Sequence, residues 1–162
     1  MIFSKTRPVK IILLGAGGTG GHIAPHLYRL LYSLDRPVKF ILCDGDTVEE
    51  KNLVRQNFTQ ADLGENKARV TAERYSAAFG LEASYIPAYV EDPERLEELI
   101  KPDYYRTGRD VTHPKNGVRY PEEVPELVIL IGAVDNNRSR QMCHTVFQHT
   151  RELIYIDSGN GE

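Results

Sequence analysis

Short apolar runs alternate with longer polar stretches along this chain, and their lengths are those of strands. Four nearly continuous runs lie at residues 9–14, 38–43, 127–131 and 153–156. Such runs are typical of strands that are covered on both faces, as in a parallel sheet. A weaker run over residues 83–90, which Pro87 interrupts, predicts one further short strand.

Between these runs, apolar residues recur at helical spacing. The spacing predicts helices over residues 19–34, 67–79, 94–100 and 138–150. Gly80 is placed to end the second helix and Pro93 to open the third. Because Pro25 lies inside the first helical pattern, we expect a late helix start or a small kink there. The alternation predicts an α/β fold: a Rossmann-like, doubly wound, mostly parallel sheet with helices on both faces.

Two stretches show neither a continuous apolar run nor apolar residues at helical spacing. Residues 45–66 are polar and too long for a simple connection, and long loops in compact domains are commonly functional. Residues 101–126 are rich in proline, glycine and charged residues, and Asn116-Gly117 is a dipeptide that favours a hairpin turn. We therefore expect residues 101–126 to be a surface insertion. The length of 162 residues predicts a single domain over residues 1–162.

Composition argues against several classes of function. The formal net charge of −3 favours binding neither to nucleic acid nor to an acidic membrane. The sequence contains no apolar run of membrane-spanning length, and its first residues do not resemble a signal peptide, so we expect a cytoplasmic protein. The two cysteines, Cys43 and Cys143, form no C-x-x-C pair, which argues against a zinc site built on such pairs.

A glycine-rich stretch follows the first apolar run and precedes the first helical pattern. It reads Leu-Leu-Gly-Ala-Gly-Gly-Thr-Gly-Gly and contains Gly15, Gly17, Gly18 and Gly20. Strand, glycine turn and helix in this order predict a nucleotide-binding loop. The first glycine would allow the tight turn, the second the approach of a phosphate to the backbone, and Gly20 the close packing of helix on strand. The phosphate would lie at the helix N-terminus, where free N–H groups attract negative charge.

Asp44 directly follows the second apolar run. An acidic residue at the end of that strand can accept hydrogen bonds from ribose hydroxyls. Up to this point, an NAD(P)-dependent oxidoreductase explains the sequence as well as an ATP-binding protein does.

The residues after Asp44 carry a more specific pattern. The stretch from Asp44 to Ala68 contains D-G-D-T-V-E-E-K-N-L-V-R-Q and then D-L-G-E-N-K-A, and residues 133–136 read A-V-D-N. This resembles the signature of the ThiF/MoeB/HesA-type adenylyltransferases, the ubiquitin-activating superfamily. The resemblance runs from about Val9 to Gly161. Within that superfamily, the chain is most similar to the ThiF-like proteins of PRTRC gene sets, whose D-x-G-N-G ending resembles residues 157–161.

The resemblance implies ATP and Mg²⁺ as cofactors and a role for each matched residue. Arg55 and Lys67 would contact the transferring phosphate, and Asp135 would hold the metal ion. The nucleotide would be bound by Gly15, Gly17, Gly18, Gly20, Asp44, Asp46, Asn52, Gln56 and Asn136. The implied reaction is adenylation of the C-terminal glycine of a small ubiquitin-like or sulfur-carrier protein, with release of pyrophosphate. The implied assembly is a homodimer.

Two departures from the family keep alternatives open. Family members usually continue beyond the fifth strand, so we expect this adenylation domain to be incomplete at its C-terminus. Family members also place a partner subunit's arginine on the phosphates, and Arg7 is the only residue here that could correspond. A non-catalytic nucleotide-binding scaffold is therefore one alternative. An oxidoreductase is the other, although it leaves Arg55, Lys67 and Asp135 without a role.

Overall fold

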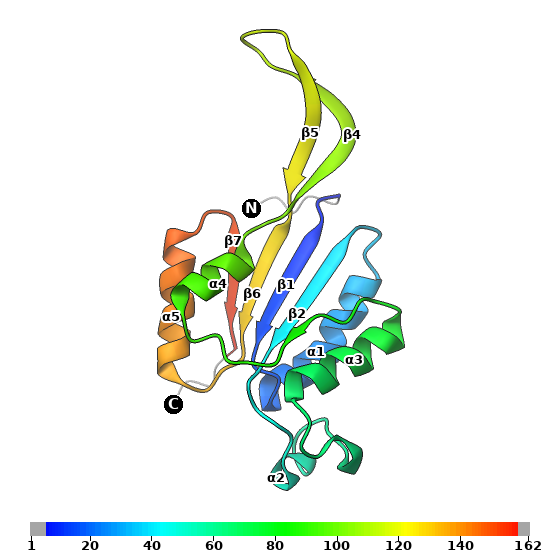
Figure 1. The fold of residues 1–162 in the computed structure, drawn as a ribbon, viewed down its shortest axis with the longest axis vertical. Helices are drawn as coiled ribbons and strands as arrows, with labels where there is room; N and C mark the ends of the chain where they lie inside the picture. Colours follow the sequence, from blue (N-terminus) through cyan, green and yellow to red (C-terminus); the bar gives the residue numbers. More distant parts are fainter. Residues whose placement is uncertain (1–5, 159–162) are drawn as a thin grey trace.

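A computed structural model describes residues 6–158, which form a five-stranded parallel sheet with helices on both faces (Figure 1). The strands lie in the order β3-β2-β1-β6-β7. Their bounds are Tyr85–Ile86 for β3, Val38–Cys43 for β2, Val9–Leu14 for β1, Leu127–Gly132 for β6 and Leu153–Asp157 for β7. Every pairing in this sheet is parallel, so all five strands end at the same edge. The predicted fold class is confirmed.

Each face of the sheet is covered by its own pair of helices. Helices α1 (Gly18–Tyr32) and α3 (Lys67–Phe79) cover one face, and α4 (Pro93–Ile100) and α5 (Asn137–His149) cover the other (Figure 1). Successive residues of β1 alternate between the two cores, with Ile11 and Leu13 in one cluster and Ile12 in the other. All six residues of β1 are buried, as expected for a central strand covered on both sides.

The order of the strands reverses between β1 and β6. The chain moves outward from β1 through β2 to β3, then returns across the sheet to place β6 on the other side of β1. In open α/β sheets, ligands bind outside the carboxyl ends of the strands at such a switch point. Here that point lies between Gly15, which follows β1, and Ala133, which follows β6.

The third predicted strand is shorter than expected. The run over residues 83–90 forms only β3, whose Tyr85 and Ile86 pair with Leu42 and Cys43. Pro87 follows at once and cannot donate to the ladder, so the strand ends there.

The expected late start of the first helix is wrong, because α1 begins at Gly18 and includes Pro25. A proline in a helix interior has no N–H for the carbonyl four residues earlier, which is that of Gly21. In this structure the side-chain amide of Asn57 donates to the Gly21 carbonyl oxygen over 3.1 Å. A residue of the polar 45–66 stretch therefore supplies the hydrogen bond that Pro25 cannot make.

The segment 101–126 holds an antiparallel hairpin that projects from the amino-terminal end of the sheet (Figure 1). Its strands are β4 (Tyr104–Thr112) and β5 (Arg119–Pro125), and residues 113–118 form the turn, with Gly117 at φ +69°. A buried ion pair lies at its base, where the Lys10 ammonium is 3.1 Å from a Glu126 carboxylate oxygen. The other carboxylate oxygen of Glu126 accepts from the Tyr105 hydroxyl of β4. These contacts attach the hairpin to the central strand.

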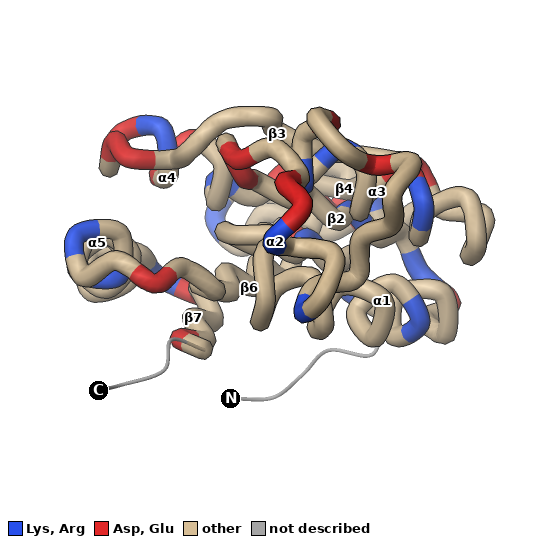
Figure 2. The backbone as a smooth tube through the Cα atoms, turned by 90° about the horizontal axis from the view of Figure 1, so that it is seen from below, with Lys and Arg blue, Asp and Glu red and all other residues tan. Residues whose placement is uncertain are grey.

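At the opposite end of the molecule, the 45–66 stretch contains the short helix α2 (Glu50–Leu53) and a 3₁₀ turn over Gln60–Asp62. Viewed toward the carboxyl edge of the sheet, α2 lies in front of the strands (Figure 2). Among residues 6–158, no helix is long and apolar enough to cross a membrane.

Candidate functional site

The glycine loop turns between β1 and α1 in a space that admits no side chain at two positions. Gly15 has φ +93°, and a Cβ added there would lie 2.5 Å from the Ala133 carbonyl oxygen. A Cβ at Gly20 would overlap the Gly15 carbonyl oxygen. The roles predicted for these two glycines, a tight turn and the close packing of helix on strand, agree with this geometry.

The other side of the loop is open. A Cβ at Gly18 would meet no atom within 4 Å, and one at Gly17 would meet only the Gln56 side-chain nitrogen, at 3.8 Å. In the described part of the chain, no side chain caps the start of α1, and its first turn has no acidic residue. The first N–H groups of α1 therefore remain available to an anion.

Asp44 joins the end of β2 to this loop. One of its carboxylate oxygens accepts from the Ala16 amide at 2.6 Å, and the other accepts from the Asp46 amide at 2.8 Å. Burial raises the pKa of Asp44, and the two amide donors oppose that shift. Carboxylate oxygens can accept further hydrogen bonds, so this position remains compatible with the predicted contact to a ribose.

Asp46 lies between two donors from different parts of the chain. The Lys67 ammonium, which is buried at the start of α3, is 3.0 Å from one oxygen, and the Tyr89 hydroxyl donates to the other. The Tyr89 hydrogen bond and then Lys67 hold the pKa of Asp46 below its usual range. Tyr89 was not expected at this site, because a tyrosine at the end of the weak apolar run over residues 83–90 belongs to no motif that would single it out.

The polar stretch contains two further predicted residues, Asn52 and Gln56, and the Gln56 side chain lies beside the glycine loop. Buried Asn52 shapes α2, since its side-chain oxygen accepts from the Glu49 amide at 2.9 Å and its carbonyl from the Gln56 amide at 2.9 Å. The side-chain oxygen of Gln56 is buried, and no donor among the described residues reaches it. An unsatisfied buried acceptor costs about 1–3 kcal/mol, so this atom is suited to a ligand donor.

The remaining predicted residues are exposed. Within residues 6–158, the side chains of Arg55 and Asp135 make no hydrogen bond or ion pair. Asn136 caps α5, because its side-chain oxygen accepts from the Ser139 amide at 2.7 Å. The part of the chain that the structure describes contains no cluster of three or more potential metal ligands. Asp135 is one carboxylate that would be able to bind Mg²⁺, which commonly takes one or two carboxylates together with phosphates and water.

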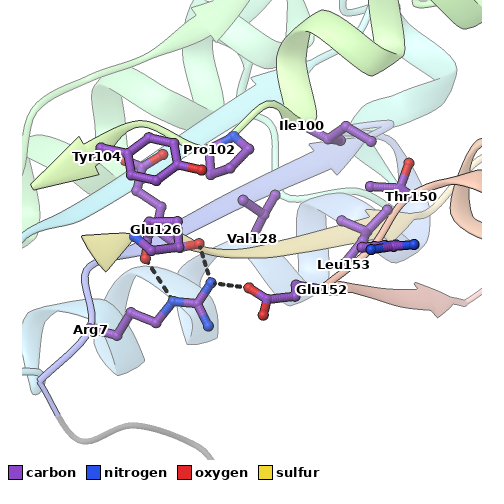
Figure 3. A pocket seen from close by; sticks show the side chains of 11 residues that line it. Arg7, Ile100, Pro102, Tyr104, Glu126, Val128, Thr150, Glu152 and Leu153 are labelled. Atoms are coloured by element: carbon purple, nitrogen blue, oxygen red, sulfur yellow. Dashed lines mark hydrogen bonds and ion pairs between the residues drawn. The ribbon is translucent and has the colours of Figure 1, made fainter. Parts of the chain in front are cut away.

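Arg7 lies far from these residues, at the amino-terminal end of the sheet. It borders a cavity of about 240 Å³ at the base of the hairpin, with an apolar lining that includes Ile100, Val128 and Leu153 (Figure 3). Its guanidinium donates to the Pro125 carbonyl oxygen at 2.6 Å and pairs with Glu152 at 2.8 Å. Within this chain, Arg7 therefore does not join the glycine loop.

A family model described as the ThiF family matches residues 3–154, nearly the whole chain. This chain belongs to the ThiF family. The ending of residues 157–161, which resembles the PRTRC variant, lies mostly outside the described residues.

Solved structures of similar fold include two proteins bound to nucleotides, TcdA and MccB. One is E. coli TcdA, a tRNA N6-threonylcarbamoyladenosine dehydratase, solved in complex with AMP. It is 18% identical to this chain with a TM-score of 0.65, and the match covers 92% of this chain and 49% of the TcdA chain. E. coli MccB with ATP is 23% identical with a TM-score of 0.58, over 93% and 36% of the two chains. The structure of MccB with AMPCPP and MccA is 22% identical to this chain, with a TM-score of 0.58. It matches 93% of this chain and 37% of the MccB chain.

This ThiF-family chain thus spans between about a third and a half of the length of these solved structures. No curated protein sequence matches it. At these identities the likeness shows the fold. The structure places most of the predicted residues along one edge of that fold, from the glycine loop through Asp44 and Asp46 to Lys67, with Gln56 above the loop. Their roles toward a nucleotide remain predictions.

Proposed function

We propose that this ThiF-family chain binds ATP with Mg²⁺ along the carboxyl edge of its sheet. The observation that carries the proposal is the buried, unpartnered Gln56 oxygen beside the open side of the glycine loop. A hydroxyl or amine of a nucleotide would satisfy that oxygen, while the N–H groups of α1 would bind its phosphates. Family membership supports ATP over a redox cofactor, as does the presence of ATP, AMP or AMPCPP in the MccB and TcdA structures.

The bound nucleotide would donate its adenylyl group to a carboxylate, with Mg²⁺ offsetting the charge of the triphosphate. Exposed Arg55 has a planar guanidinium that matches two phosphate oxygens. Lys67 would contact the same phosphate as a point charge. Asp135, at the end of β6, would hold the metal ion. No residue need act as a general base, because the acceptor carboxylate is already ionised at pH 7.

We propose that the intact protein adenylates the C-terminal glycine of a small ubiquitin-like or sulfur-carrier protein, and that it is a homodimer. The carboxylate would attack the α-phosphorus, forming an acyl-adenylate as the bond to pyrophosphate breaks. A peptide acceptor is a second candidate, and the structure of MccB with MccA and AMPCPP supports an acceptor other than a ubiquitin-like carrier.

Calorimetric titration with ATP·Mg²⁺, with NAD⁺ in parallel, tests the nucleotide site. We expect ATP to bind in the presence of Mg²⁺ and Asp135→Ala to weaken that binding. Asp110→Ala is the matched control, since Asp110 lies on the hairpin at the other end of the molecule. Binding of NAD⁺ with no response to ATP would instead support an oxidoreductase. Binding of neither would reject the nucleotide site.

ATP–pyrophosphate exchange by the intact protein with its acceptor tests the activity. We expect Arg55→Ala to abolish most of the exchange and Arg109→Ala, which removes an exposed hairpin arginine, to leave it unchanged. Full activity of both Arg55→Ala and Lys67→Ala would reject the assignment. ATP binding without exchange would favour a non-catalytic scaffold.

A further inference from the structure

The carboxylate of Asp46 is shared between two donors that come from different segments. One oxygen is 3.0 Å from the Lys67 ammonium, and the other accepts from the Tyr89 hydroxyl. The Lys67 side chain is only 7% exposed, so its charge depends on a nearby anion, and Asp46 supplies that anion. The Asp46 main chain is also fixed, since its amide donates to Asp44 and its carbonyl accepts from the Lys67 amide at 2.9 Å.

Tyr89 reaches Asp46 across a gap that only glycine leaves open. A Cβ added at Gly45 would lie 2.6 Å from a carbon of the Tyr89 ring, so the ring packs directly on the Gly45 backbone. Tyr89 follows β3 and precedes α4, and it is 59% exposed. Burial of the ring therefore does not explain its position as well as the hydrogen bond to Asp46 does.

Two donors on one carboxylate each reduce the negative charge that the other experiences. With Tyr89 in place, Lys67 shares the Asp46 carboxylate with a second donor. If the ammonium leaves, the carboxylate still accepts a hydrogen bond from the Tyr89 hydroxyl. Among the described residues, the Lys67 ammonium would be the only charged or hydroxyl side-chain donor to Asp46 if the Tyr89 hydroxyl were absent, and its departure would leave the half-exposed carboxylate to water alone. The cost of moving Lys67 away from Asp46 is therefore lower when Tyr89 is present.

We infer that Tyr89 is a positioning residue that allows Lys67 to leave Asp46 for a ligand phosphate. The inference rests on the proposed function for the identity of that ligand. The hydroxyl of Tyr89 acts through Asp46 and needs no contact with the nucleotide. We therefore expect removal of the Tyr89 hydroxyl to make the ion pair of Lys67 and Asp46 tighter.

The first measurement needs no nucleotide. The full chain is labelled with acetic anhydride, and the rate of acetylation at Lys67 is followed by mass spectrometry. Tyr89→Phe keeps the ring over Gly45, and we expect it to slow the labelling about threefold to tenfold, as loss of one hydrogen bond implies. Asp46→Asn should speed the labelling, which verifies that the assay reports on the ion pair. Tyr104→Phe, on the exposed hairpin, is the matched control.

The second measurement compares ATP·Mg²⁺ with adenosine, which lacks phosphates. We expect Tyr89→Phe to weaken ATP binding by a similar factor and to leave adenosine binding unchanged. An unchanged or faster labelling of Lys67 in Tyr89→Phe would overturn the inference, and so would an equal loss of affinity for both ligands. If the unaltered chain binds no ATP, the proposed function fails, while the labelling of the ligand-free chain still decides whether Tyr89 loosens Lys67.

Discussion

The hydrogen bond from Asn57 to Gly21 depends on a proline in a different segment, and this dependence can be measured. Pro25 leaves the Gly21 carbonyl without its helical donor, and the Asn57 side chain donates to it at 3.1 Å. Pro25→Ala restores an N–H at position 25 that can donate to the same carbonyl. The two donors therefore substitute for each other, and their mutations should not be additive.

The magnitudes follow from the separate contributions. Asn57→Ala removes one partly buried hydrogen bond and should lower the free energy of unfolding by about 0.5–1.5 kcal/mol. Pro25→Ala should raise it by about 1–3 kcal/mol, because proline in a helix interior costs about 3 kcal/mol and part of that is offset in the unfolded chain. In the Pro25→Ala background, Asn57→Ala should cost about 0 kcal/mol, because the Gly21 carbonyl then has a helical donor.

Urea unfolding of the four proteins, followed by far-ultraviolet circular dichroism, gives the coupling free energy, which we expect to be about 1 kcal/mol. The Asn57 main-chain carbonyl, which accepts from Arg74 at 2.9 Å, is retained in every variant, so only the side-chain bond changes. An equal cost of Asn57→Ala in both backgrounds would show that Asn57 does not replace the missing donor.

Three further predictions follow from the geometry of single positions. Gly20→Ala forces a Cβ into a carbonyl oxygen and should lower the free energy of unfolding by about 3 kcal/mol or more in urea titrations, whereas Gly18→Ala meets no atom within 4 Å and should change it by less than about 1 kcal/mol. Glu126→Gln leaves the buried Lys10 ammonium without its counter-charge and should cost about 3–5 kcal/mol, measured in the same way; a cost below about 1 kcal/mol would mean that the pair is dispensable. The pKa of Asp46 is lowered in the folded chain, so its stabilising contribution is present above the unfolded pKa and is lost as pH falls through the folded pKa. Asp46→Asn should therefore make the free energy of unfolding depend less on pH in the acid range, as measured by urea titrations at several pH values.

The sequence was sufficient wherever a feature depends on neighbouring residues. The bounds of β1, β2 and α3 follow from local apolar patterns, and the tight turn at Gly15 follows from its place between a strand and a helix. Family signatures then indicated residues that the fold places along one edge.

Features that join distant segments were not predictable in this way. Tyr89 meets Asp46, Asn57 meets Gly21, and Glu126 meets Lys10 only after the sheet has formed. No local spacing or motif in the sequence indicates any of these pairs, because the partners are far apart in the chain and meet only in the folded structure. Pro87 already indicated an interrupted strand over residues 83–90, but a hydropathy pattern does not resolve that only Tyr85 and Ile86 pair with β2.

The contact of Gly15 with Ala133 has a consequence for synthesis on the ribosome. The central strand pairs Val9 with Leu127, so β1 cannot acquire its second neighbour until β6 has emerged. A nascent chain that ends before β6 therefore exposes one edge of its central strand and lacks the backbone on which the glycine turn packs. The candidate site is complete only after most of the chain has been made, so nucleotide binding would report that synthesis has passed β6.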